Sequence, residues 1–118
     1  MESTTKITAQ RLNKVLPDSL AIAEKYYSLL STLNKLNLTS REIELIAFTA
    51  VKGNISYANI RQEFCEKYGS SSATINNMIS KLKKISVFVK DGTKIKVNPV
   101  IVLNFDNNIV LQITLKHG

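Results

Sequence analysis

The stretch that decides the fold is IRQEFCEKYGSSSATINNMISKL, residues 60–82. Apolar residues recur at helical spacing from Ile60 to Phe64, which predicts a helix. Gly69 is well placed to end that helix, because glycine adopts left-handed backbone angles without steric cost. The serines at 70–72 supply N-cap side chains for a second helix, since a serine hydroxyl accepts from an early backbone N–H.

The second of these helices has two different faces. Ile75, Ile79 and Leu82 recur every three or four residues and are expected to face the core, with Met78 at the edge of this stripe. The outer face is polar and basic, and comprises Thr74, Asn76, Asn77, Ser80, Lys81, Lys83 and Lys84. Two helices joined by a short Gly/Ser turn, the second with such a face, match the helix-turn-helix arrangement.

Two further helices are expected before this pair. Asp18 can cap the first, which should fade around residues 34–37. Residues 39–42 (TSRE) form a capping box that begins the second, and Gly53 is placed to end it. Ser56 is expected to cap the helix that contains Ile60 and Phe64.

After Lys84 the spacing of apolar residues changes from helical to alternating. Ile85, Val87 and Val89 alternate with Ser86, Phe88 and Lys90, then Asp91-Gly92 predicts a turn, and residues 94–97 return as a second strand. Residues 98–99 (NP) break this strand, because proline cannot donate to a ladder.

A second pair of strands is predicted beyond Pro99. Residues 100–103 (VIVL) are continuously apolar, which predicts a strand buried on both faces. Residues 106–108 (DNN) predict a turn, and Leu111, Ile113 and Leu115 then share one face of a last strand. This surplus beyond a simple hairpin indicates edge pairing with another copy or another protein.

The order of four helices and four strands predicts an α+β fold, a winged helix-turn-helix with its helices first and a C-terminal antiparallel hairpin or small sheet. Residues 1–38 are expected to form an arm and a helix that serve in oligomerisation or docking. Residues 39–98 form the winged helix-turn-helix itself, and residues 99–118 are expected to be a C-terminal β extension of the same domain.

The positive charge is concentrated in the second half of the chain. The net charge of +7 divides into +2 for residues 1–52 and +5 for residues 53–118, where nine Lys/Arg face four Asp/Glu. Residues 72–98 contain six lysines and one acid, Asp91. A local basic surface is typical of polyanion binders, although a lysine-rich solvated face is the alternative explanation.

The segment 60–82 resembles the winged-helix superfamily of DNA-binding domains, in particular those of phage and plasmid replication initiators and small bacterial regulators. Residues 94–99 (KIKVNP) are similar to the strand that ends a wing in such initiators. The resemblance covers about half of the chain and implies double-stranded DNA as the partner. The residues then expected to contact DNA are Ser72, Thr74, Asn76, Asn77, Ser80, Lys81, Lys83, Lys84, Lys90, Thr93, Lys94 and Lys96.

Each group of these residues also has a structural explanation. Asn76 and Asn77 suit adenine edges, but the helix contains no arginine, the commonest reader of guanine. The lysines at 81, 83 and 84 suit phosphates, and they equally suit the negative end of the helix dipole. The hairpin tip, residues 90–94, can be a wing or an ordinary solvated turn.

Enzymatic function is not expected. The chain contains no HExxH, GxxxxGK[ST] or GxGxxG motif, and its one histidine, His117, is the penultimate residue. One cysteine cannot form a disulfide within the chain or a cysteine metal cluster, so we expect no metal, no cofactor and no small-molecule substrate. No apolar run is long enough for a bilayer. The expected location is the cytoplasm, or the host cytoplasm or virion for a phage protein.

Two functions therefore stay open. The first is a small DNA-binding protein, phage or plasmid encoded, that acts in transcription or replication control by non-covalent duplex binding. The second is a phage virion protein, such as a head–tail connector or ring subunit, that uses a similar fold for self-association or contact with other assembly proteins. Fold alone does not decide between them.

Overall fold

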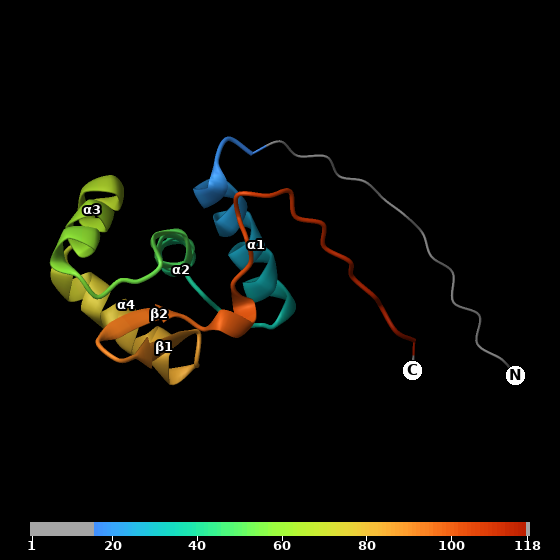
Figure 1. Cartoon of the computed structure of the whole chain (residues 1–118). Helices are drawn as coiled ribbons and strands as arrows, with labels where there is room; N and C mark the ends of the chain where they lie inside the picture. Colours follow the sequence, from blue (N-terminus) through green and yellow to red (C-terminus); the bar gives the residue numbers. More distant parts are fainter. Residues whose placement is uncertain (1–15, 118) are drawn as a thin grey trace, which may run out of the picture.

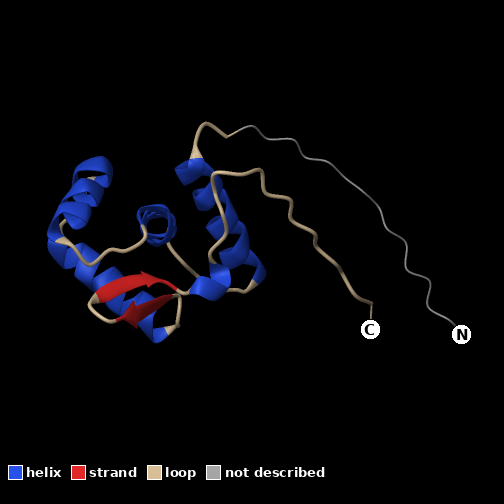
Figure 2. Cartoon of the chain, viewed as in Figure 1, coloured by secondary structure: helices blue, strands red, loops and turns tan. Residues whose placement is uncertain are grey.

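The structure is a computed structural model that describes residues 16–117. Four helices come first and a two-stranded antiparallel hairpin follows, so the predicted α+β class is confirmed (Figure 1), as the secondary-structure colouring of Figure 2 also shows. In chain order the elements are α1 (Ser19–Leu33), α2 (Ser40–Lys52), α3 (Ala58–Tyr68), α4 (Ser72–Lys84), β1 (Phe88–Asp91), β2 (Lys94–Val97) and the 3-10 helix η1 (Pro99–Ile101). The arm predicted at the N-terminus lies, up to residue 15, outside the described residues.

Three of the helices begin at the side-chain caps that the sequence predicts. The side chains of Asp18 and Ser71 each accept a hydrogen bond from a backbone N–H three residues on, at 2.8 and 3.2 Å. The capping box of α2 is complete, because the Thr39 hydroxyl accepts from the Glu42 N–H at 3.1 Å and the Glu42 carboxylate accepts from the Thr39 N–H at 2.7 Å. Gly53 ends α2 at a φ of 94°, where glycine is favoured.

The predicted cap of α3 is wrong. The N-cap is Tyr57, whose side chain makes no capping hydrogen bond. The Ser56 hydroxyl instead accepts from the backbone N–H of Ile95 in β2, and the Ile55 N–H donates to the Ile95 carbonyl at 2.9 Å. The segment before α3 therefore satisfies the outer edge of β2, since strand N–H and C=O groups need partners.

The hairpin is confirmed, but its alternation begins differently from the prediction. The alternation in the sequence predicts Phe88 on the polar side of the first strand, whereas the structure pairs it with Val97 and buries both residues, at 1% and 3% exposure. Ser86 has a φ of 62°, and Val87 donates to the Leu82 carbonyl at 2.9 Å. This left-handed residue separates α4 from β1 and resets which residues face inward.

The second pair of predicted strands is wrong for the described residues. Residues 100–103 do not form a buried strand, because the chain turns into η1, where the Asn98 side chain accepts from the Val100 N–H at 3.1 Å. The Val100 side chain is 86% exposed. Residues 107–117 contain no strand either, so the predicted β extension is an exposed segment with hairpin pairing confined to β1 and β2.

The first part of this C-terminal segment is nevertheless held against α1. The Tyr27 hydroxyl donates to the Ile101 carbonyl at 2.8 Å, and burial raises the pKa of Tyr27, which keeps this donor protonated. The Phe105 ring lies 5.6 Å from the Tyr27 ring and 5.7 Å from that of Tyr26, measured between centroids. Figure 1 shows the chain running along α1 and then leaving the body of the molecule.

The core forms around α2, which packs against α1, α3 and β2. Its largest fully buried side chains include Leu45 and Ile46 from α2, Phe64 from α3, and Ile75 from α4. The apolar stripes predicted for these helices thus face one another. This arrangement leaves the opposite face of α4 and the tip of the hairpin in solvent.

Candidate nucleic-acid interface

The outer face of α4 carries most of the residues that the sequence assigned to DNA contact. All eight of them are exposed: Ser72, Thr74, Asn76, Asn77, Ser80, Lys81, Lys83 and Lys84. The predicted inward residues are buried: Ile75, Met78, Ile79 and Leu82. On the hairpin, Lys90, Thr93 and Lys94 are exposed and Lys96 is half-buried. The structure therefore brings eight candidates together on one helix face and places the other four on the adjacent hairpin.

Lys81 is engaged within the protein. Its Nζ lies 2.9 and 3.0 Å from the two carboxylate oxygens of Glu42, the residue that closes the capping box of α2. The Glu42 side chain is 6% exposed, whereas that of Lys81 is 45% exposed. This pair joins α4 to the start of α2 across 39 residues of sequence. Lys81 is consequently a weaker candidate for a phosphate than its neighbours.

The environment of Glu42 keeps it ionised. Burial opposes the charged form, but hydrogen bonds from the Thr39 backbone N–H, from Lys81 and from the Thr39 hydroxyl, with the positive charge of Lys81, outweigh it and lower the pKa of Glu42. The carboxylate therefore caps the start of α2 and also binds Lys81 of α4. Lys81 supports the fold through this contact.

Lys96 is also paired. Its Nζ lies 2.9 Å from Asp91 Oδ2, across the hairpin and two residues along β2 from Lys94, the residue directly opposite Asp91. The hydrogen bond from Lys96 lowers the pKa of Asp91, and the charge of Lys94, directly opposite in the register, acts in the same direction. The only acid of the basic region is thus bound to one of its lysines.

The four remaining lysines are Lys83, Lys84, Lys90 and Lys94. None of them forms an ion pair with a residue in the described range 16–117. Two lie in the last turn of α4 and two flank the hairpin turn. Their charges are free for a polyanion, so the basic surface is smaller than the lysine count of the sequence indicates.

Sequence reasoning missed Arg61, a half-buried residue of α3. Its Nη1 donates to the side-chain oxygen of Asn76 at 2.7 Å, and its Nε donates to the Ile55 carbonyl at 2.8 Å. An arginine in the first helix of the predicted pair was a visible signal. Its contact with α4 depends on how α3 packs there, which spacing along the chain does not give.

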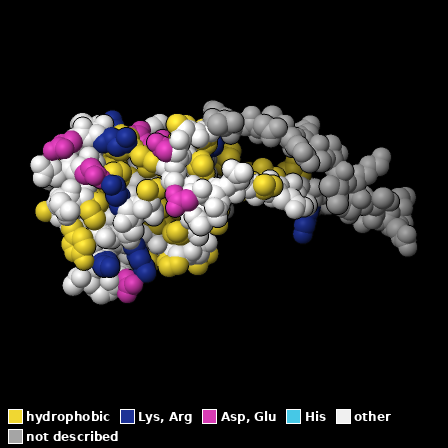
Figure 3. Space-filling model, turned by 45° about the horizontal axis from the view of Figure 1, so that its top comes forward, with side chains coloured by type: hydrophobic (Ala, Val, Ile, Leu, Met, Phe, Trp, Pro, Cys, Tyr) yellow, Lys and Arg dark blue, Asp and Glu magenta, His cyan; other side chains and the backbone are white. Residues whose placement is uncertain are grey.

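A second kind of surface surrounds the C-terminal segment. Large apolar side chains that are at least 38% exposed include Val100, Val102, Leu103, Val110, Leu111, Ile113 and Leu115. Figure 3 shows hydrophobic side chains between acidic and basic ones on one face of the molecule. This apolar surface is chemically distinct from the polar face of α4, and it suits protein contact better than DNA.

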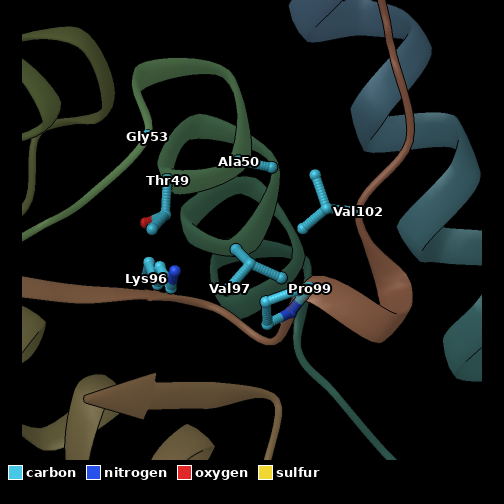
Figure 4. Close-up of a pocket in the computed structure, with 7 residues that line it drawn as sticks. All are labelled: Thr49, Ala50, Gly53, Lys96, Val97, Pro99 and Val102. Carbon is cyan, nitrogen blue, oxygen red and sulfur yellow. The ribbon is translucent and has the colours of Figure 1, made fainter. Parts of the chain in front are cut away.

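A shallow hollow of about 340 Å³ lies between α2, β2 and the start of the C-terminal segment (Figure 4). Its lining is mostly apolar and includes Ala50, Val97 and Val102, with Lys96 at one side. The Thr49 hydroxyl, also in the lining, is buried and has no hydrogen-bond partner among the described residues. Thr49 and Lys96 are the polar side chains of this lining.

Within residues 16–117 no three His, Cys, Asp or Glu side chains come together in a way that would hold a metal ion. The helices of this part are too short or too polar to cross a membrane. No family model, no curated protein and no solved structure matches the chain. The exposed face of α4, the free lysines and Arg61 are therefore the features on which a function can be argued.

Proposed function

We propose that this protein is a winged-helix DNA-binding protein that acts in transcription or replication control. In this proposal α4 enters the major groove, and the turn between β1 and β2 lies against the neighbouring phosphates. The observation that carries the proposal is the single face of α4 on which eight polar or basic residues are exposed together. Small side chains at its start, including Ser72 and Thr74, permit close approach to a groove.

The distribution of charge supports the same orientation. Lys83 and Lys84 lie at the far end of α4, and Lys90 and Lys94 lie at the tip of the adjacent hairpin, so the cations lie near the polar part of the face. In this proposal they contact phosphates, because phosphate contacts fix orientation and base contacts read sequence. The polar residues of α4 are then free to meet base edges.

The test is the salt dependence of binding to a mixed-sequence duplex, measured by fluorescence anisotropy. Each phosphate contact contributes about 0.9 to the slope of log K against log salt. The double variant Lys83→Ala/Lys84→Ala should flatten this slope by about 1.8 if both lysines contact phosphates. The control Lys25→Ala/Lys116→Ala removes the same charge from exposed sites on α1 and the C-terminal segment and should leave the slope near that of the unmodified protein. Undetectable or salt-independent binding would refute the proposal.

A second candidate function rests on the exposed apolar residues after η1. We propose as the alternative an assembly subunit, such as a virion connector or ring protein, in which the segment around Ile113 and Leu115 contacts another chain. The side chains of these two residues are 58% and 92% exposed. Light scattering during size-exclusion chromatography separates the two candidates. A large closed oligomer without DNA that Ile113→Ser/Leu115→Ser dissociates favours assembly, and a monomer or dimer that shifts on adding duplex favours DNA binding.

A further inference from the structure

Arg61 reaches from α3 to the outer face of α4 and is fixed there by two hydrogen bonds. Its Nε is bound to the Ile55 carbonyl and its Nη1 to the Asn76 side-chain oxygen. A guanidinium group has five N–H donors, so three remain for another partner. Because the group is planar and its two hydrogen bonds go to the segment before α3 and to α4, its remaining donors have a defined direction.

The contact with Arg61 also determines what Asn76 can offer. An asparagine that reads adenine accepts from the base N6 amino group and donates to N7, so it uses both ends of its amide. Here the Asn76 oxygen accepts from a charged donor at 2.7 Å. The Asn76 oxygen keeps one lone pair, which lies beside the positive charge of Arg61, and the amide nitrogen is the donor that Asn76 offers to a base.

Arg61 keeps its full charge for a ligand. Of the acids on α3, Glu63 lies 2.7 Å from Lys52 and Glu66 accepts from Gln62 at 3.1 Å. Arg61 forms no ion pair with any residue in the described part of the chain.

From these contacts we infer that Arg61 and Asn76 act together as a guanine-reading pair in the major groove. Arg61 offers only N–H donors, the amide nitrogen of Asn76 also donates, and guanine presents two acceptors, O6 and N7, at its major-groove edge. Adenine presents a donor beside N7, which would meet another donor. This inference rests on the proposed function, and it supplies the base preference that the sequence of α4 alone lacks.

The experiment is selection of bound duplexes from a random-sequence pool, followed by affinity measurements on the enriched sequence. We expect one guanine position at which replacement by adenine weakens binding about 5- to 150-fold, the range that a good bidentate contact provides. Replacing that guanine with 7-deazaguanine, which lacks the N7 acceptor, should weaken the unmodified protein as well. This last measurement needs no protein variant, so it does not depend on whether a variant folds.

The protein variants distinguish a role of Arg61 in base contact from a purely structural role in joining α3 to α4. Arg61→Lys keeps the positive charge and should retain the salt slope. Lysine lacks the planar pair of N–H donors of a guanidinium group, so the guanine preference should fall to less than about twofold. Asn76→Ala should reduce the same preference, whereas Asn77→Ala, the adjacent exposed residue of α4, should leave that position unchanged. Thermal unfolding of each variant checks its fold.

The outcomes distinguish this inference from the function on which it rests. Salt-dependent duplex binding without an enriched guanine overturns the guanine-reading pair and leaves DNA binding intact. A guanine preference that persists in Arg61→Lys or tolerates 7-deazaguanine also overturns it. The absence of any duplex binding overturns both proposals.

Discussion

Replacing Glu42 with glutamine should lower the stability of the protein and at the same time steepen the salt dependence of DNA binding. Glu42 accepts from the Thr39 N–H at 2.7 Å and contacts Lys81 Nζ at 2.9 Å. Glutamine keeps an amide oxygen that can accept from Thr39, so the capping box can survive. The carboxylate charge that holds Lys81 is lost, and the lysine is then free to turn toward a phosphate.

The size of the stability loss follows from the burial of the two partners. A hydrogen bond to a charged group contributes about 1.5–3 kcal/mol. The Glu42 side chain is 6% exposed, but Lys81 is 45% exposed, and water screens that side of the pair. We therefore expect the free energy of unfolding to fall by about 1.5 kcal/mol, at the lower end of this range. For a domain of this size that corresponds to a fall in Tm of about 6–7 °C.

The same substitution should change how stability depends on pH. Folding lowers the pKa of Glu42 below its ordinary value of 4.5, so the unfolded chain binds the proton more readily than the folded chain. This contribution to stability is complete above that value and is lost as the pH falls through the lower pKa of the folded state. The loss of stability between neutral and acidic pH should therefore be smaller in Glu42→Gln than in the unmodified protein.

The matched control is Glu44→Gln, two residues further along α2. Glu44 lies 3.0 Å from Arg41, but this pair is more solvent-exposed, with side chains that are 25% and 41% exposed. Surface pairs of this kind contribute little, so the control should cost less than about 0.5 kcal/mol. Chemical denaturation monitored by circular dichroism measures both variants, and repeating it from pH 3 to pH 7 tests the pH dependence.

The DNA measurement completes the test. If Lys81 is released to a phosphate, the slope of log K against log salt should steepen by about 0.9 in Glu42→Gln. The Glu44→Gln protein, which also gains one positive charge relative to the parent, should leave the slope unchanged. The reasoning is refuted if Glu42→Gln is as stable as the parent, or if both glutamine variants change the slope equally.

Three further substitutions test contacts that organise the fold around this face. Ser71→Ala removes the N-cap of α4 and should cost about 1 kcal/mol, measured by denaturation; an unchanged stability would mean that water replaces the hydroxyl. Tyr27→Phe removes the 2.8 Å hydrogen bond to the Ile101 carbonyl and should cost about 1–1.5 kcal/mol, with faster proteolysis of the C-terminal segment as a second readout. Thr49→Val replaces a buried, unpartnered hydroxyl by a methyl group and should raise stability by about 1 kcal/mol, so a clear destabilisation would show that the hydroxyl is satisfied in solution.

The parts of the fold that the sequence predicts are those set by neighbouring residues. The caps at Asp18, Thr39 and Ser71 act on N–H groups three residues away, so a short window contains the whole signal. The cap of α3 failed this rule because Ser56 is used by β2, a partner 39 residues on. The preference of serine for an N-cap was overridden because the backbone N–H of Ile95, at the edge of β2, needed a hydrogen-bond acceptor.

The strands after Pro99 were wrong for a related reason. A strand is stabilised by pairing with another strand, and apolar alternation reports only that a residue suits one. Residues 107–117 keep that alternation but have no strand beside them in the described structure. The apolar residues beyond Pro99 therefore lie at the surface, where many of them are exposed.

The sequence predicted which residues of α4 are exposed, but it did not predict which charged side chains are bound within the protein. The exposure of the α4 residues followed from helical periodicity, whereas the pairing of Lys81 with Glu42 spans 39 residues and that of Arg61 with Asn76 spans 15. Such contacts depend on how helices pack, which single-sequence spacing does not provide. They decide which cations are available and which amide can read a base.

The pairing of Lys81 with Glu42 and of Lys96 with Asp91 gives the DNA-binding proposal a numerical test. Six lysines acting on phosphates would give a salt slope of about 5.4 in magnitude, whereas the four without a carboxylate partner in residues 16–117 give about 3.6. A slope of the smaller size means modest non-specific affinity, so useful recognition would depend on the bases that Arg61 and Asn76 contact. A slope near the larger value would mean that Lys81 and Lys96 leave Glu42 and Asp91 when DNA binds. In that case DNA binding would break the contact between Lys81 and Glu42 that joins α4 to α2. The stability of the fold and its affinity for DNA would then be coupled through Lys81.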